Sequence, residues 1–120
     1  MERLTLPNDK ISPTVLQHVA SLHRPIIEEI ANAVAGDAVV VVGMAQNPFV
    51  KKARKLLDEG GMKYTYLEYG SYFSKWKERL AIKLWAGFPT FPMVFVGGTL
   101  EGGFTELKKL HEEGKLKPRA

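Results

Sequence analysis

The sequence has no cysteine among its 120 residues. Disulfide bonds, thiolate metal ligands and cysteine nucleophiles are therefore excluded together. The histidines, His18, His23 and His111, have no partner at the spacing of metal ligands, so we expect no metal site. Ser71 and Ser74 lack the histidine and aspartate that would activate a serine nucleophile. Composition and spacing thus offer no residue for covalent or metal-dependent catalysis.

Long hydrophobic segments are absent as well. The longest apolar run, residues 38–42, is far shorter than the roughly 20 residues that cross a bilayer. Residues 1–10 lack the apolar stretch of a secretory signal peptide. We therefore expect a cytoplasmic protein that has no membrane partner.

Strong charge of one sign is also lacking, since the formal net charge is only +4. Positive side chains concentrate in residues 51–55 and 108–119, and solvated helix faces with a frayed tail explain both stretches. Aromatic side chains between residues 64 and 76 lie near Lys75 and Lys77, a combination also found in single-strand nucleic-acid sites. Core and rim packing explains these aromatics better, so we expect no nucleic-acid partner.

The first third of the chain is predicted to be helical. Ser12-Pro13 is a typical helix start, and apolar residues then recur at helical spacing as far as Gly36. Pro25 interrupts this pattern. The sequence therefore predicts two short helices, or one broken helix, before residue 37.

The next segment predicts a strand, a helix and a second strand. Residues 38–42 form a continuous apolar run, which is typical of a strand buried on both faces. Asn47-Pro48 repeats the cap-and-proline start of a helix that ends at Gly60-Gly61. Residues 64–69 alternate as a strand, so the three elements predict a right-handed βαβ unit.

The last third predicts a helix, an extended segment, a hairpin and a final helix. These elements correspond to residues 76–87, 88–92, 93–101 and 105–113. Gly97-Gly98 is the expected hairpin turn. The complete order predicts an α/β fold with a mixed four-stranded sheet and helices on both of its faces.

This order of elements resembles the thioredoxin fold, and three stretches narrow the resemblance to the glutaredoxin family. Residues 39–57 resemble the strand, loop and helix whose loop carries Cys-Pro-Tyr-Cys in that family. Residues 88–96, FPTFPMVFV, resemble the Trp-Pro-Thr-Phe-Pro-Gln segment of the monothiol, Cys-Gly-Phe-Ser branch, in which the second proline is cis. Residues 102–116 resemble the Gly-Gly-Cys-Asp segment and the helix that follows it in the same branch.

The resemblance implies that the chain is divided into three parts. These are an N-terminal helical extension, a glutaredoxin-like domain and a tail, at residues 1–37, 38–116 and 117–120. Asn47 and Val50 occupy the family's cysteine positions, so the family's glutathione-dependent thiol–disulfide exchange has no thiolate to start from. Asn47 is also a preferred helix cap, which gives it a purely structural explanation.

The resemblance further implies a groove for glutathione. The residues that match the family's ligand-binding positions are Arg79, Thr90, Phe91, Pro92, Gly103, Phe104 and Thr105. The family's lysine before the loop is Met44 here, and its aspartate after the Gly-Gly pair is Thr105. Half of the recognition set is retained, so we expect weak rather than tight glutathione binding, with preservation of the fold as the alternative explanation.

Three hypotheses for the function stay open at this point. The first is a redox-inactive binding module that uses the groove between the Asn47 loop, Pro92 and Gly103 to bind glutathione or an unknown protein partner. The second is an enzyme or an iron–sulfur-linked carrier in which bound glutathione supplies the only thiol. The third is a structural adaptor that has no small-molecule ligand.

Overall fold

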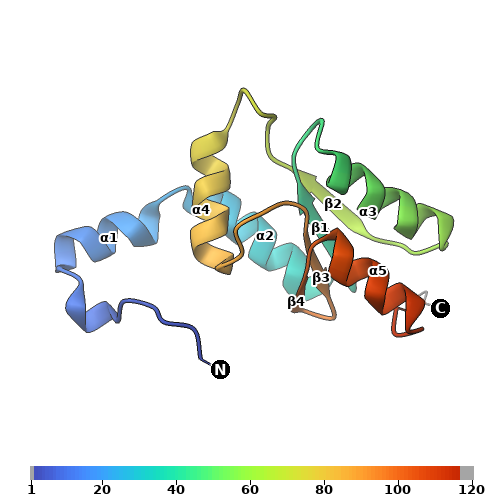
Figure 1. Ribbon diagram of the computed structural model, residues 1–120. Helices are drawn as coiled ribbons and strands as arrows, with labels where there is room; N and C mark the ends of the chain where they lie inside the picture. The colour runs from blue at the N-terminus through green and yellow to red at the C-terminus, as the bar shows by residue number, and fades with distance from the viewer. Residues whose placement is uncertain (1, 117–120) are drawn as a thin grey trace.

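The computed structural model describes residues 2–116 and contains a mixed four-stranded sheet with helices packed on both faces (Figure 1). The predicted tail, residues 117–120, lies outside the described residues. In chain order the elements are η1 (Asn8–Lys10), α1 (Pro13–Ser21), α2 (Arg24–Gly36), β1 (Val39–Gly43), α3 (Pro48–Glu59), β2 (Thr65–Glu68), α4 (Trp76–Ala86), β3 (Met93–Val96), β4 (Thr99–Gly102) and α5 (Phe104–Glu112).

The strands lie in the order β2-β1-β3-β4, so β1 and β3 are the central strands. β1 pairs in parallel with β2, where Val41 lies opposite Tyr66, and antiparallel with β3, where it lies opposite Val94. β3 and β4 form an antiparallel hairpin. Its turn residues, Gly97 and Gly98, have φ angles of 57° and 84°, a conformation that glycine adopts without strain. The predicted βαβ unit and hairpin are thus confirmed.

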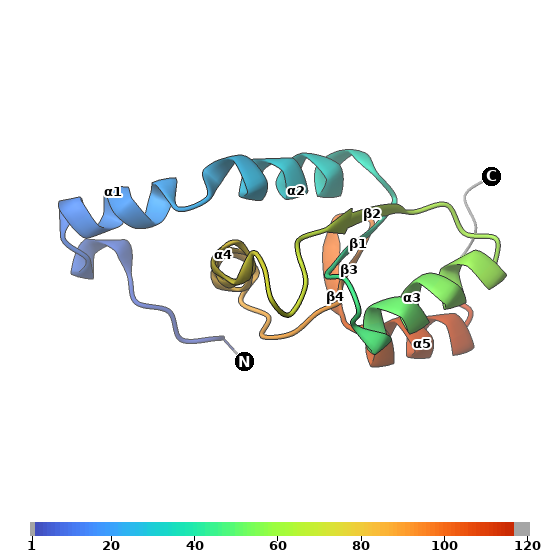
Figure 2. The ribbon, with the colours of Figure 1, turned by 90° about the horizontal axis from the view of Figure 1, so that it is seen from above.

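Alternate residues of β1 point into two separate cores. Val40 and Val42 pack with Ile30 of α2 and Ile82 of α4. On the opposite face the core contains Val39, Val41, Ala53, Leu57, Val94 and Leu107, from β1, α3, β3 and α5. Viewed from above, α3 and α5 lie together on one side of the sheet, and α2 lies on the other (Figure 2). The unbroken apolar run in the sequence is therefore explained by burial of β1 on both faces.

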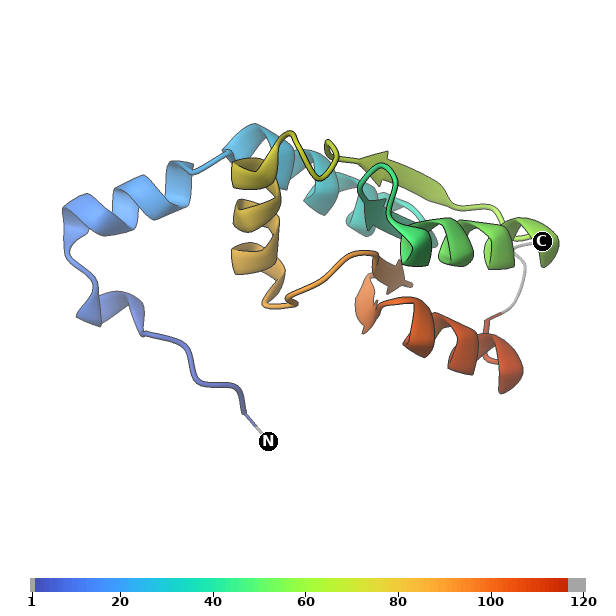
Figure 3. The same ribbon diagram turned by 45° about the horizontal axis from the view of Figure 1, so that its top comes forward.

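The N-terminal third of the chain contains two helices that pack very differently. α2 places Ile30 in the core with no exposed surface. α1 has no buried residue and extends away from the sheet (Figure 3). Between them His23 adopts a left-handed conformation with φ of 46°, and Pro25 lies in the first turn of α2. Residues 2–37 thus combine a helix that covers the sheet with a preceding segment that stands apart from it.

Three aromatic residues differ from the predicted core and rim packing. Phe73 is 92% exposed, and Tyr72 is also exposed in the connection to α4. Trp76, the first residue of α4, is exposed as well. Tyr69 is buried as expected. β2 ends at Glu68, so Tyr72 and Phe73 lie in the connection to α4, where no strand pairing holds side chains against the sheet.

Among residues 2–116, none of the helices is both long enough and apolar enough to cross a membrane.

We predict that Ile30→Ala lowers the free energy of unfolding by about 2–5 kcal/mol, because it leaves a cavity between α2 and the sheet. Val15→Ala on exposed α1 serves as the control and should change it by less than about 0.5 kcal/mol. Urea denaturation measures both values. Equal, small losses in the two variants would contradict the assignment of α2 to the core.

Candidate functional site

Asn47 caps the N-terminus of α3. Its Oδ1 atom accepts hydrogen bonds from the backbone N–H groups of Phe49, at 2.9 Å, and Val50, at 3.1 Å. Pro48 occupies the first turn, where its missing N–H leaves nothing unsatisfied. The first-turn donors that would stabilise an anion at this helix end are therefore partly occupied by a neutral carboxamide.

The loop that carries Asn47 is held against the segment that follows β2. Tyr69 donates its backbone N–H to the carbonyl of Gly43 at 2.9 Å, and Ala45 donates to the carbonyl of Gly70 at 2.8 Å. Gln46, next to the cap, has a positive φ of 65°. These contacts fix where β1 ends and α3 begins.

Val50, at the family's second cysteine position, is a core residue. It is 2% exposed and packs against the backbone of Gly43. A Cβ atom on Gly43 would lie 2.8 Å from a Val50 methyl group and 3.0 Å from the ring of Tyr66. This position therefore fills space between β1, α3 and β2.

A groove of about 540 Å³ opens beside the start of α3. Three segments far apart in the sequence line it, namely residues 47–49, 88–92 and 103–106, together with Met44, Tyr72 and Lys83. Six of the predicted ligand-binding residues meet here, which are Thr90, Phe91, Pro92, Gly103, Phe104 and Thr105. A groove of this volume is large enough for a small peptide-like ligand.

The floor of the groove is formed by Phe91 and Pro92, both buried, which are joined by a cis peptide bond as the resemblance implied. The glycine pair lies directly beside them. Gly102 has a φ of 126°, and a Cβ atom on Gly103 would come within 3.4 Å of the Pro92 carbonyl oxygen. The start of α5 therefore lies in van der Waals contact with the cis-proline, and the positive φ of Gly102 is a conformation that favours glycine.

Glu106 is a groove residue that the sequence analysis missed. Its carboxylate accepts the backbone N–H of Gly103 at 3.0 Å. The N–H groups of Phe104 and Thr105 remain as first-turn donors of α5. A carboxylate here stabilises the helix end but also places negative charge where an anionic ligand would bind. The Gly-x-x-Glu spacing was the available signal, because it matches a capping box in which glycine replaces serine.

Arg79 is placed behind the groove rather than in it. The residue is 7% exposed, and its Nη1 atom donates to the backbone carbonyls of Tyr69, at 3.0 Å, and Ser74, at 2.5 Å. Lys83, one helical turn further along α4, is the basic side chain on the groove wall. Its Nζ atom lies 5.6 Å from the centre of the Phe91 ring. Arg79 thus braces the loop before α4, while Lys83 borders the groove.

The shifted pKa values belong to residues that support the loop. Burial raises the pKa of Tyr69, and its hydrogen bond to Glu29 adds to the increase. Burial likewise raises the pKa of Tyr66, whose hydroxyl group donates to Glu68 at 2.9 Å. Arg54 lies 4.0 Å above the Tyr66 ring. Both phenols therefore stay protonated at neutral pH, and their hydroxyl groups donate to Glu68 and Glu29.

The fold and the groove define a thioredoxin-fold protein in which a cis-proline lies beside the N-terminus of the helix after β1. No model of a known protein family matches the chain. A glutaredoxin-like protein from Dictyostelium discoideum is 47% identical over 107 residues, which cover 89% of this chain and 87% of that protein. A glutaredoxin from Ricinus communis is 34% identical over 85 residues, 71% of this chain and 83% of that protein.

Solved structures agree with this relationship at the level of the fold. The crystal structure of a buckwheat glutaredoxin–glutathione complex matches with a TM-score of 0.66 at 23% identity, and covers 80% of this chain and 87% of that chain. The chain belongs to the glutaredoxin family, and it has no cysteine at either position of the family's motif.

We predict that Asn47→Ala destabilises the protein by about 0.5–2 kcal/mol, since it leaves the N–H groups of Phe49 and Val50 without their acceptor. Asn47→Ser keeps a capping oxygen and should stay close to the parent stability. Thermal and urea unfolding of the three proteins test this. Equal loss in both variants would show that the side chain matters for a reason other than capping.

Proposed function

We propose that this protein is a binding module of the glutaredoxin family that is redox-inactive on its own and uses the groove beside Pro92 to bind glutathione weakly. The observation that carries the proposal is the groove itself. The cis-proline, Gly103 and the start of α3 are assembled around one cavity, although the residue at its thiol position is a carboxamide.

Loss of redox activity follows from the chemistry of residue 47. Disulfide exchange begins with a thiolate that attacks sulfur, and this chain contains no thiol. The Asn47 oxygen accepts two backbone N–H groups, so its Nδ2 amino group is the part of the side chain left for a ligand. A primary amide neither ionises nor forms a mixed disulfide at neutral pH.

Binding is supported by groups that do not depend on a thiol. Backbone N–H and C=O groups around Phe91, the N–H groups of Phe104 and Thr105, and the ammonium of Lys83 all border the groove. They match a ligand that carries peptide bonds and carboxylates. The Glu106 carboxylate and the apolar Met44 side chain oppose tight binding of an anion. Together, these favourable and opposing groups suggest a dissociation constant for glutathione in the millimolar range.

We predict that glutathione added to isotope-labelled protein produces saturable amide shifts at Phe91, Gly103, Phe104 and Thr105. Lys83→Ala should weaken the binding severalfold, because it removes the cation on the groove wall. Lys77→Ala is the matched control, since Lys77 is an exposed lysine on the same helix outside the groove. Glu106→Gln should tighten the binding, since it removes the competing negative charge.

Two results would count against the glutathione proposal. One is the absence of shifts at high millimolar glutathione, which would leave the protein-interaction scaffold as the better account. The other is equal weakening by Lys83→Ala and Lys77→Ala, which would indicate general charge attraction rather than a site.

We also predict that Asn47→Cys gains thiol–disulfide chemistry. The introduced thiolate would attack oxidised glutathione, form a mixed disulfide and release one glutathione thiolate. Its pKa should fall below the ordinary value of about 8.5, because the first-turn N–H groups of α3 stabilise the anion. Mass spectrometry measures the adduct, and pH-dependent alkylation measures the pKa.

Val50→Cys is the control for this experiment. It places the only thiol of the chain in the core, where it should react slowly. If the Asn47→Cys thiol had an ordinary pKa and formed the adduct no faster than the Val50→Cys thiol, the start of α3 would not be a preserved thiol site.

A further inference from the structure

A second cavity, of about 440 Å³, adjoins the groove at the C-terminal end of α4. Residues 3–5 line one side of it, and Lys83, Leu84 and residues 87–89 line the other. Lys83, Phe88 and Pro89 also line the groove, so the two spaces share a wall. In the views of Figure 1 and Figure 2 the start of the chain approaches the connection that follows α4. We refer to this space as the N-terminal cavity.

Arg3 attaches the start of the chain to the end of α4. Its Nη1 atom donates to the backbone carbonyl of Ala86 at 3.3 Å. The guanidinium lies over Gly87, which ends α4 with a φ of 72°, and a Cβ atom at that position would overlap it. Leu4, next in the chain, is 99% exposed. The contact therefore depends on the arginine and on the missing side chain of Gly87.

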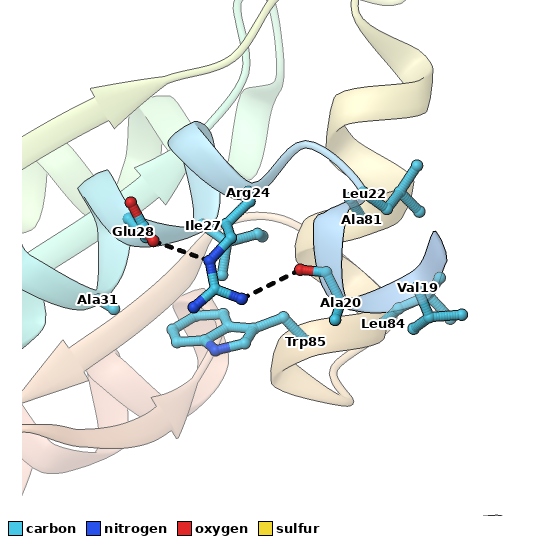
Figure 4. A pocket seen from close by; sticks show the side chains of 10 residues that line it. All are labelled: Val19, Ala20, Leu22, Arg24, Ile27, Glu28, Ala31, Ala81, Leu84 and Trp85. Atoms are coloured by element: carbon cyan, nitrogen blue, oxygen red, sulfur yellow. Dashed lines mark hydrogen bonds and ion pairs between the residues drawn. The ribbon is translucent and has the colours of Figure 1, made fainter. Parts of the chain in front are cut away.

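The charges around the N-terminal cavity are uncompensated. Among residues 2–116, neither Arg3 nor Lys83 forms an ion pair. No aspartate or glutamate lines the cavity. Arg24 shows the contrast, because it pairs with Glu28 at 2.8 Å beside a separate recess between α1, α2 and α4 (Figure 4).

This arrangement favours an anionic occupant. Two cations that border one cavity repel each other, and an anion placed between them turns that repulsion into attraction. Arg3 still has Nε and Nη2 as donors when Nη1 is held by Ala86, and a guanidinium presents its donors in a geometry that matches a carboxylate. Glu106, the acid of the groove, caps Gly103 and does not line this cavity.

We propose that Arg3 and Lys83 together bind a carboxylate of the ligand in the groove, so that the start of the chain forms part of the binding site. This inference rests on the proposed function and extends it to a segment that precedes the glutaredoxin-like domain. Glutathione has two carboxylates. One lies at the first turn of α5, and the other reaches across the shared wall to the two cations.

Glutathione titration of a matched set of variants tests the role of the charge. Arg3→Gln should weaken binding severalfold, whereas Arg3→Lys keeps the charge and should retain most of the affinity. Lys10→Gln is the control, because it removes the same charge upstream of α1 and outside both cavities. The difference between the parent and Arg3→Gln should shrink in roughly 0.5 M salt, which screens charges that are exposed to solvent.

The position of Arg3 can be measured without any ligand. In amide NMR spectra of the free protein, Arg3→Gln should shift the signals of Gly87 and Phe88, because the guanidinium no longer lies over them. Lys10→Gln should leave both signals in place. Circular dichroism checks that the variants remain folded.

The outcomes separate this inference from the proposed function. Equal glutathione affinity of Arg3→Gln and Lys10→Gln would overturn the inference and leave the groove as the binding site. Unchanged Gly87 and Phe88 signals in free Arg3→Gln would overturn it as well, since the start of the chain would then lie elsewhere. A parent protein that binds no glutathione would overturn both proposals.

Discussion

Burial of β1 on both faces is the constraint on which the rest of the structure depends. Val40, Val41 and Val42 have no exposed surface, and two cores meet the strand from opposite sides. β2 and β3 pair with its two edges, so two of the three strand pairings of the sheet involve β1. The position of β1 also determines where the groove forms, because the loop after the carboxyl end of β1 places Asn47 at the start of α3.

The start of α3 shows how one feature of a helix supports two kinds of chemistry. The unpaired N–H groups of a first turn stabilise a thiolate when cysteine stands there. In this protein the Asn47 oxygen accepts two of those N–H groups instead. The helix keeps its cap and the loop keeps its shape, while the nucleophile is gone. The cis-proline Pro92 and Gly103 line the same groove as Asn47.

Local sequence signals predicted most of the fold. The valine run of β1, the Asn47-Pro48 helix start and the Gly97-Gly98 turn each depend on neighbouring residues alone, and each was found where expected. Thr90 to Pro92 and Gly103 to Thr105 also meet in one groove, as the resemblance implied.

Features that depend on packing between elements were harder to predict. Arg79 and Lys83 lie one turn apart on the same side of α4. The way this helix packs against the rest of the structure places Lys83 at the border of the groove and buries Arg79 behind it. The exposure of Phe73 could not be deduced from the alternating pattern, because the strand stops before it. The capping role of Glu106 has a local signal in its spacing from Gly103, which the resemblance to the family's Gly-Gly-Cys-Asp segment obscured.

We propose that the groove binds glutathione through backbone groups and charge, although an amide stands at its thiol position. A crystal structure of the protein with saturating glutathione tests it most directly. The account predicts the tripeptide along the Phe91–Pro92 main chain, with a carboxylate at the first turn of α5 and no covalent bond to Asn47. Glutathione bound elsewhere, or a groove that stays empty at saturation, would contradict the account.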